Sequence, residues 1–287
     1  GRYDPNKLLR LYREEGVTFS HGVPTVLQMI LNCDETEATD MSGWKLLTGG
    51  SAATPALAQQ MVDQGILLFT AYGMSETCPL VSAIFLKPSE RELQLSEQIP
   101  LRIKAGVPIG LVDLKIVDPE GNDVAHDGDA VGEIVMRSPW LTQGYYKEAA
   151  KGEELWENGW LHTGDVASID KDYVIQIKDR IKDVIKTGGE WISSLELENL
   201  ISQYPAVSEV AVVGVPDEKW GERPFALVVP KAGEELNGAA IQQHLQQYVD
   251  SGHINKWAVP QDIKVVSDIP KTSVGKINKK VIRTQVE

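Results

Sequence analysis

The sequence predicts a mixed α/β fold, α+β overall. It would contain the remainder of a parallel βα subdomain, a small antiparallel β-barrel-like subdomain and a carboxyl-terminal α+β domain. Helix and strand signals alternate over residues 4–70, which is typical of right-handed crossovers and a parallel sheet. Later runs are shorter and are broken by turn residues, as in a small antiparallel barrel or sandwich. The expected domains are 1–105, 106–178 and 179–287.

Capping residues place the helices of the first part. Asp4 precedes Pro5 and Thr54 precedes Pro55, and a capping side chain followed by proline at the first helical position begins a helix. The expected helices begin at residues 5, 24 and 55, and the expected strands are 17–20, 44–48 and 66–71. Residues 87–105 lack clear periodicity and are expected to form a loop.

The later elements follow from shorter signals. Turns are expected at 119–122 and 170–172. Ser193, with Glu196 three residues later, forms a capping box that opens a helix ending near residue 202. A second helix is expected at 237–249. The remaining expected strands are 131–137, 173–177, 181–186, 210–215, 225–229 and 263–266.

Composition excludes several classes of function. The chain has 28 Lys and Arg against 41 Asp and Glu, and its net charge of -13 argues against generic nucleic-acid binding or a role at an anionic membrane surface. A local basic pocket for a phosphorylated ligand stays open. We expect no integral membrane segment, because no apolar run approaches the ~20 residues of a membrane helix. Two cysteines are too few for a disulfide framework, which favours a reducing, cytoplasmic location.

A pair of glycines follows the strand expected at 44–48. Gly49 and Gly50, followed by Ser51 and Ala52, would place backbone close to a ligand at the carboxyl end of a parallel sheet. Glycine pairs are common, however, and a tight strand-to-helix turn is the alternative reading.

A second loop follows the strand expected at 66–71. Tyr72, before Gly73, offers a flat ring for a base. Ser75 offers a hydroxyl for phosphate, and Glu76 could hold a Mg²⁺ that neutralises it. A turn with a serine cap and a solvated glutamate is the alternative. Because the two loops leave neighbouring parallel strands, we expect them to lie side by side.

Three later features carry further chemistry. Asp165 follows Thr-Gly, where a carboxylate can accept hydrogen bonds from both ribose hydroxyls; the alternative is an aspartate in a turn. His162 is interpreted as a structural residue. Alternating charges over 178–186 usually mean a solvated strand edge, but the glycine pair that follows favours a hinge with a close-approach loop. Lys276 follows a glycine near the chain end, as a mobile cation or a surface lysine.

Taken together and in this order, these motifs resemble the acyl-adenylate-forming superfamily, which contains acyl-CoA synthetases, peptide-synthetase adenylation domains and firefly luciferase. The stretches 160–165 and 179–186 are most similar to medium- and long-chain fatty acyl-CoA synthetases. The resemblance implies a two-step ligase, in which a fatty acid or other small carboxylate reacts with ATP to give acyl-AMP and pyrophosphate. CoA then gives acyl-CoA and AMP.

The resemblance also implies residue roles. Lys276 would be the catalytic lysine of the first step, Glu76 the Mg²⁺ ligand, and Lys182 the hinge of a mobile domain 179–287. CoA would bind at Lys186, Gly188 and Gly189. ATP or AMP would bind at Gly49, Gly50, Ser51, Ala52, Tyr72, Gly73, Ser75, Asp165 and Arg180.

One departure from the family matters. Its Ser/Thr/Gly-rich phosphate loop, which ends in lysine, is absent from this sequence. The sequence therefore resembles the carboxyl-terminal half of a synthetase, and we expect the isolated chain to be inactive. The alternatives are an adenylation domain that loads a carrier protein and, for the isolated chain, a non-catalytic nucleotide-binding module. The sequence leaves the oligomeric state open, a homodimer included.

Overall fold

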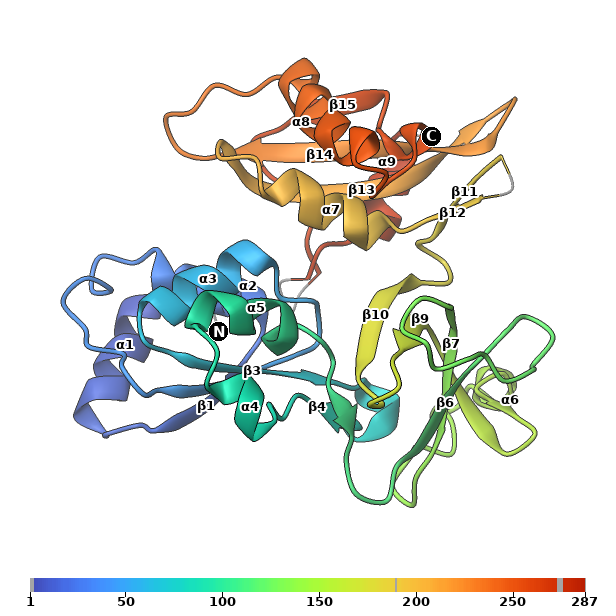
Figure 1. The fold of residues 1–287 in the computed structure, drawn as a ribbon, viewed down its shortest axis with the longest axis horizontal. Helices are drawn as coiled ribbons and strands as arrows, with labels where there is room; N and C mark the ends of the chain where they lie inside the picture. The colour runs from blue at the N-terminus through green and yellow to red at the C-terminus, as the bar shows by residue number, and fades with distance from the viewer. Residues whose placement is uncertain (1–2, 189, 273–275, 287) are drawn as a thin grey trace. The chain divides into compact units, whose positions relative to one another are not determined.

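The computed structural model describes residues 3–188, 190–272 and 276–286. The chain divides into two compact units, Gly1–Ile177 and Lys178–Glu287, which are described separately below. Figure 1 shows the elements of both units. In the described ranges, no helix is both long enough and apolar enough to cross a membrane.

The first unit begins with a five-stranded sheet in the order β1-β2-β3-β4-β5. The first three strands pair in parallel, so the expected parallel sheet is confirmed. Helices and strands alternate here because each parallel connection needs a crossover. The strands are β1 (Phe19–Gly22), β2 (Lys45–Thr48), β3 (Leu67–Tyr72), β4 (Ser82–Ala83) and β5 (Val107–Pro108).

Apolar helix faces cover this sheet. α2 and α3 begin where the prolines predict, with Thr54 accepting a hydrogen bond from the backbone N–H of Leu57. Side chains of α1, α2, α3, β2 and β3 form one buried cluster. The helices are α1 (Pro5–Glu14), α2 (Pro24–Leu31) and α3 (Pro55–Asp63).

The prediction of a loop at 87–105 is wrong, because this segment contains α4 (Pro88–Arg91) and α5 (Leu95–Arg102). Glu97 accepts a hydrogen bond from the backbone N–H of Gln94 and caps α5. Arg102 occupies a buried position of α5, where its guanidinium donates to the carbonyl of Leu68 at 2.8 Å. A charged residue on the buried face, together with Pro100 inside the helix, hides the helical pattern in the sequence.

A second sheet completes the first unit, in the order β10-β9-β7-β6 with β8 paired to β9. β6 with β7 and β7 with β9 pair antiparallel, as expected, and the described strands form an open sheet rather than a closed barrel. Asp170 closes the expected turn between β9 and β10. The elements are β6 (Asp113–Val117), β7 (Gly132–Arg137), α6 (Ala149–Glu153), β8 (Trp156–Glu157), β9 (Trp160–Ile169) and β10 (Ile175–Arg180).

The second unit is an α+β module, as the sequence predicts. Its sheet has the order β12-β11-β14-β13, and β15 pairs with β14 in parallel. The strands are β11 (Ile185–Thr187), β12 (Glu190–Ile192), β13 (Val207–Asp217), β14 (Gly221–Pro230) and β15 (Asp262–Val265), and the helices are α7 (Ser194–Ser202), α8 (Gly238–Asp250) and α9 (Lys279–Val286).

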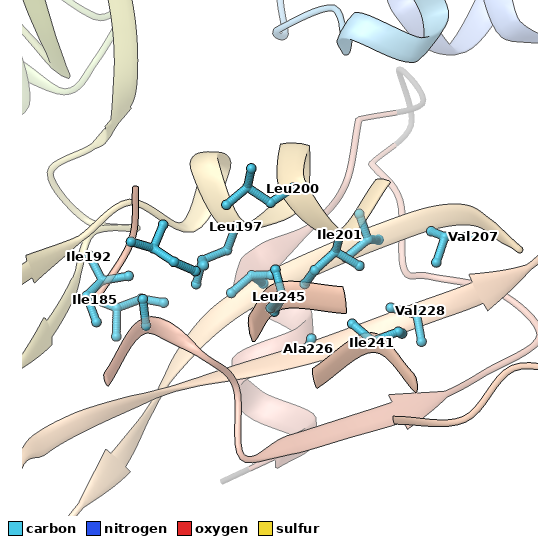
Figure 2. Packing of buried hydrophobic residues seen from close by; sticks show 14 residues of the cluster. Ile185, Ile192, Leu197, Leu200, Ile201, Val207, Ala226, Val228, Ile241 and Leu245 are labelled. Carbon is cyan, nitrogen blue, oxygen red and sulfur yellow. The ribbon is translucent and has the colours of Figure 1, made fainter. Parts of the chain in front are cut away.

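Two apolar clusters hold the helices of the second unit to its sheet. Leu197 of α7 and Leu245 of α8 pack with Val228 of β14 in the larger cluster (Figure 2). Ile282 of α9 packs with Phe225 in a separate cluster. Because neighbouring residues of a strand point to opposite faces, these clusters place α7 and α8 on one face of the sheet and α9 on the other.

The prediction of a strand at 181–186 is largely wrong. Only residues 185–187 belong to β11, and residues 181–184 form a turn. The backbone N–H groups of Asp183 and Val184 both donate to the carbonyl of Arg180, at 2.8 and 2.9 Å, so the chain turns instead of extending. The charged residues Lys182 and Asp183 therefore belong to a tight connection between β10 and β11.

Candidate functional site

The two loops expected to lie side by side leave adjacent strands. β2 and β3 pair in parallel with Thr48 opposite Thr70, so their carboxyl ends share one edge of the sheet. A Cβ atom added to Gly49 would lie 2.9 Å from the carbonyl oxygen of Ala71 on β3, which only glycine tolerates. Gly50 has φ +80°, and the exposed Ser51 and Ala52 follow it.

The second loop is built around another close approach. A Cβ atom on Gly73 would fall 1.8 Å from the carbonyl oxygen of Pro79, so the loop closes onto itself. Residues Ser75–Thr77 form a short 3₁₀ turn, in which the hydroxyl of Thr77 accepts from the backbone N–H of Met74. This turn leaves Ser75 exposed and Glu76 half-buried.

Tyr72 and Asp165 meet although 93 residues separate them. The hydroxyl of Tyr72 donates to Oδ2 of Asp165 at 2.7 Å, and Asp165 is only 5% exposed. Tyr72 ends β3 and Asp165 lies on β9, so the contact joins the two sheets of the first unit. The structure thus places an aromatic ring and a carboxylate together at the edge where the glycine loop emerges.

The part of β9 that carries Asp165 is held by a residue that the sequence analysis missed. Glu133 of β7 accepts from the backbone N–H of Gly164 at 2.8 Å, and its other oxygen lies 2.9 Å from Nδ1 of His162. His162 therefore has a structural partner, as interpreted from the sequence. Glu133 gave no sequence signal, because an acidic residue on a strand is ordinary.

Tyr145 is a second residue that sequence reasoning missed. Its hydroxyl donates to Oε1 of Glu76 at 2.6 Å, and the backbone N–H of Thr142 donates to the Glu76 carbonyl. This hydrogen bond, together with burial and the negative charge of Glu76, raises the pKa of Tyr145 to about 12. The phenol therefore stays protonated and holds the carboxylate.

The donor set at Glu76 fits a magnesium ion shared with a substrate. Within the described ranges, no group of three or more His, Cys, Asp or Glu residues could hold a metal. Mg²⁺ commonly uses one or two protein carboxylates and takes its remaining ligands from phosphates and water. A lone, oriented Glu76 matches that pattern and does not match a dedicated all-protein cage.

The predicted CoA-binding and hinge residues belong to the second unit. Lys182 is exposed in the turn, and Lys186 of β11 has its ammonium 5.8 Å from the ring centre of Trp191. Gly188 has φ +59°, and its backbone N–H donates to the carbonyl of Trp220 at 2.8 Å. Gly189 lies outside the described residues, and Arg180 is an exposed residue at the end of β10.

Lys276 lies in the same unit and is hydrogen-bonded to Thr272. Its carbonyl accepts from the backbone N–H of Thr272 at 2.7 Å, and its N–H donates to the Thr272 hydroxyl at 3.2 Å. Residues 273–275 lie outside the described ranges. The structure thus brings together the predicted residues of the first unit at one sheet edge, and it places Arg180, Lys182, Lys186, Gly188 and Lys276 in the other unit or at its start.

Comparison with known proteins identifies relatives over the whole chain. The AMP-binding enzyme family matches residues 1–146, and the AMP-binding enzyme C-terminal domain matches residues 196–276. A long-chain-fatty-acid–CoA ligase from Thermus thermophilus is 41% identical over 286 residues, which are 99% of this chain and 52% of the relative. The chain thus spans about half the length of the curated relatives it matches.

Solved structures agree with this assignment. The amide bond synthetase McbA from Marinactinospora thermotolerans has a TM-score of 0.87 and 27% identity, covering 100% of this chain and 56% of that one. The anthranilate CoA ligase AuaEII, solved in complex with anthranoyl-AMP, has a TM-score of 0.83 and 25% identity, covering 99% and 52%. By sequence and by fold, the chain belongs to the AMP-binding enzyme family of adenylate-forming enzymes.

Proposed function

We propose that this chain is the carboxyl-terminal half of an ATP-dependent, AMP-forming fatty acyl-CoA synthetase. The observation that carries the proposal is the Tyr72–Asp165 hydrogen bond, which joins an aromatic ring to a buried carboxylate beside the glycine loop. The experiments below use a protein in which the chain follows the amino-terminal half that its relatives have, called here the full-length protein. The isolated chain is expected to be inactive.

The nucleotide site is assigned from these contacts. The ring of Tyr72 would stack on adenine, and Asp165 would accept hydrogen bonds from the ribose hydroxyls, with Arg180 as a cationic partner. Ser75 would hold phosphate, and Gly73 lets the loop close on itself. The backbone of Gly49, Gly50, Ser51 and Ala52 would border adenine and the acyl carboxylate.

Magnesium is proposed at Glu76, which Tyr145 orients. Bound there with the phosphates of ATP, the ion would neutralise negative charge during adenylyl transfer. The part played by this chain is to hold one carboxylate in a fixed position.

The first step needs charge stabilisation more than acid–base chemistry. A carboxylate oxygen of the substrate attacks the α-phosphorus of ATP, and the bond to the bridging oxygen breaks to release pyrophosphate. Lys276 would supply positive charge where negative charge accumulates, and such a donor acts mainly through electrostatic stabilisation and positioning.

The second step uses the predicted hinge and CoA-binding residues. The thiolate of CoA attacks the acyl carbonyl, the mixed anhydride breaks, and AMP leaves. We propose that domain 179–287 rotates about Lys182 between the steps, so that Lys276 leaves and Lys186, Gly188 and Gly189 receive CoA. Gly188 supports this role because its φ of +59° and its tight packing on Trp220 favour glycine.

Fatty acids are the proposed substrates. The stretches 160–165 and 179–186 and the long-chain-fatty-acid–CoA ligase of Thermus thermophilus support this class. The test supplies the full-length protein with ATP, CoA and a medium-chain fatty acid, a long-chain fatty acid or anthranilate, and identifies the products by mass spectrometry. Fatty acyl-CoA with AMP is expected. Anthraniloyl-CoA alone would overturn the substrate class, and acylation of a carrier protein but not of CoA would favour the alternative.

Tyr145→Phe should weaken the use of Mg²⁺ by the full-length protein. Losing the hydroxyl frees the Glu76 carboxylate to rotate, and removing such an orienting partner costs roughly tenfold in metal affinity. Titration of the adenylation rate with Mg²⁺ measures the change. Tyr146→Phe is the matched control, because Tyr146 is 88% exposed. Identical Mg²⁺ dependence in both variants would show that Tyr145 does not orient a metal ligand.

Lys182→Pro should slow the second step selectively. Proline restricts φ and would hinder rotation at the turn, so thioester formation should fall by about tenfold, a barrier increase of about 1.4 kcal/mol, while adenylation is largely kept. Lys182→Ala, which removes the charge but keeps backbone freedom, is the control. Pyrophosphate release and CoA acylation are measured separately. Equal loss of both steps in Lys182→Pro would argue against a hinge at this position.

A further inference from the structure

The predicted hinge and the start of α9 are both flanked by charged residues of the second unit. Lys182 lies between Asp179 and Asp183 in the turn. α9 begins at Lys279, three residues after Lys276. Contacts between these flanking residues therefore connect the hinge segment with the loop that carries Lys276.

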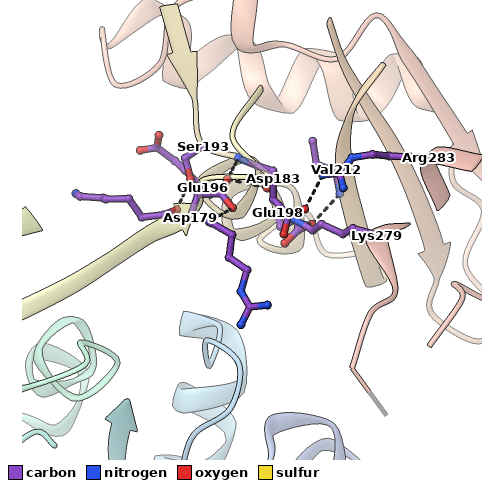
Figure 3. Close-up of polar contacts among 11 residues, drawn as sticks. Asp179, Asp183, Ser193, Glu196, Glu198, Val212, Lys279 and Arg283 are labelled. Atoms are coloured by element: carbon purple, nitrogen blue, oxygen red, sulfur yellow. Dashed lines mark hydrogen bonds and ion pairs between the residues drawn. The ribbon is translucent and has the colours of Figure 1, made fainter. Parts of the chain in front are cut away.

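The first connection passes through Ser194, the first residue of α7. Its hydroxyl donates to Oδ2 of Asp179 at 2.7 Å and accepts from Nζ of Lys279, also at 2.7 Å. The backbone N–H of Ser194 donates to the same Asp179 oxygen. Asp179 is 5% exposed and Ser194 is fully buried, so water cannot easily replace these bonds. Figure 3 shows Asp179 and Lys279 among the polar contacts of this region.

Two ion pairs support this connection. Nζ of Lys279 lies 2.8 Å from Oε1 of Glu198, which also accepts from the backbone N–H of Val212 on β13. Burial raises the pKa of Glu198, and the ammonium of Lys279 offsets part of that effect. Arg283, one turn further along α9, pairs with Asp183 (Figure 3). Removing one partner of the more buried pair, Lys279–Glu198, is strongly unfavourable, which keeps α9 in place.

The base of the Lys276 loop transmits the position of α9. The backbone N–H of Asn278 donates to the carbonyl of Pro270 at 2.8 Å, next to the pair that joins Thr272 and Lys276. On the other flank, Lys271 binds Glu209 of β13 at 2.8 Å. A displacement of Lys279 would therefore shift Lys276, and a misplacement of about 1 Å can cost about 10²-fold in rate.

We infer that Asp179, Ser194 and Lys279 form a buried relay that fixes the Lys276 loop to the hinge segment. Ser194 and Lys279 are thus positioning residues for Lys276, and they act in adenylation only. This inference rests on the proposed roles of Lys276 and Lys182. It goes beyond them by assigning a task to a buried serine that has no part in the chemistry.

Ser194→Ala in the full-length protein tests the relay, because it removes one oxygen and leaves the Lys279–Glu198 pair intact. Exchange of pyrophosphate into ATP should fall about tenfold in kcat with KM for ATP unchanged, while thioester formation from supplied acyl-adenylate stays within about twofold. Ser194→Thr, which restores a hydroxyl, should recover most of the exchange rate. Ser202→Ala is the matched control, since its hydroxyl donates to the nearby carbonyl of Asn199 on the same helix.

Hydrogen exchange gives a readout that does not depend on activity. The amides of Thr272, Lys276 and Asn278 should exchange several-fold faster in Ser194→Ala than in Ser202→Ala. An equal loss of both half-reactions, or unchanged exchange at these amides, would overturn the relay. Absence of pyrophosphate exchange in the wild type would instead refute the proposed function, and the amide comparison would still decide the relay.

A second variant covers the case in which Ser194→Ala does not fold. Arg283→Met breaks the tie to Asp183 from a side chain that is 26% exposed, where a substitution is better tolerated. Pyrophosphate exchange should again fall while thioester formation is kept, and the fall should be smaller than in Ser194→Ala. The view that these contacts hold the loop would be contradicted if a folded Arg283→Met protein had the pyrophosphate exchange rate and the amide protection of the wild type.

Discussion

Lys276→Ala in the full-length protein is expected to slow acyl-adenylate formation by a factor on the order of 10²–10³. This is the loss typical of removing one preorganised charge donor from a transition state. Thioester formation from supplied acyl-adenylate should be nearly unaffected, because the proposed rotation withdraws Lys276 before CoA reacts. Pyrophosphate release and CoA acylation, followed separately, measure the two rates.

Lys280→Ala is the control for this variant. Lys280 is an exposed residue of α9, so its removal changes the net charge equally without touching the loop. The two variants should differ in pyrophosphate release and agree in CoA acylation. If Lys276→Ala lost both steps equally, or matched the control, Lys276 would be a surface lysine.

Asp165→Ala should weaken the binding of ATP and AMP strongly. A carboxylate that accepts from two ribose hydroxyls makes charge-assisted hydrogen bonds, each worth ~1.5–3 kcal/mol, so a loss of roughly 10²-fold or more in affinity is expected. Calorimetric titration of the folded full-length variant with AMP measures it.

Asp172→Ala serves as the matched carboxylate control. Asp172 lies in an exposed turn, where its side chain pairs with Lys87 at 2.9 Å. Its removal should leave AMP affinity unchanged. If Asp165→Ala also left the affinity unchanged, Asp165 would be a structural residue of β9 whose carboxylate holds the Tyr72 hydroxyl.

Local signals predicted much of the fold. Thr54 caps α3 with its own side chain, and proline fixes the first turn, so the start of that helix depends on neighbours in sequence alone. The same is true of Ser193 at α7. The parallel pairing of β2 with β3 followed from the alternation of elements, because topology leaves few other solutions.

Long-range polar contacts account for the failures. α5 was missed because Arg102 is buried against the carbonyl of Leu68, 34 residues away. The turn at 181–184 was missed because Asp183 is held by Arg283, 100 residues away. A sequence pattern shows the charge of such residues and does not show the distant partner that allows burial.

The same distinction separates the site residues that the sequence predicted from those that it missed. Gly49, Gly73 and Asp165 stand in short motifs, so the sequence singled them out. The sequence did not single out Tyr145 or Ser194. The hydroxyl of Tyr145 contacts Glu76, 69 residues away, and that of Ser194 contacts Lys279, 85 residues away. Orienting residues of this kind become visible only when side chains are placed in space.

Exchange of labelled pyrophosphate into ATP by the full-length protein tests the central claim most directly. The measurement is made with a fatty acid present and CoA absent. Our account predicts exchange that requires the fatty acid, followed on addition of CoA by acyl-CoA and AMP in equal amounts. Exchange that does not depend on a carboxylate, or formation of ADP and phosphate in place of AMP and pyrophosphate, would contradict an acyl-adenylate mechanism.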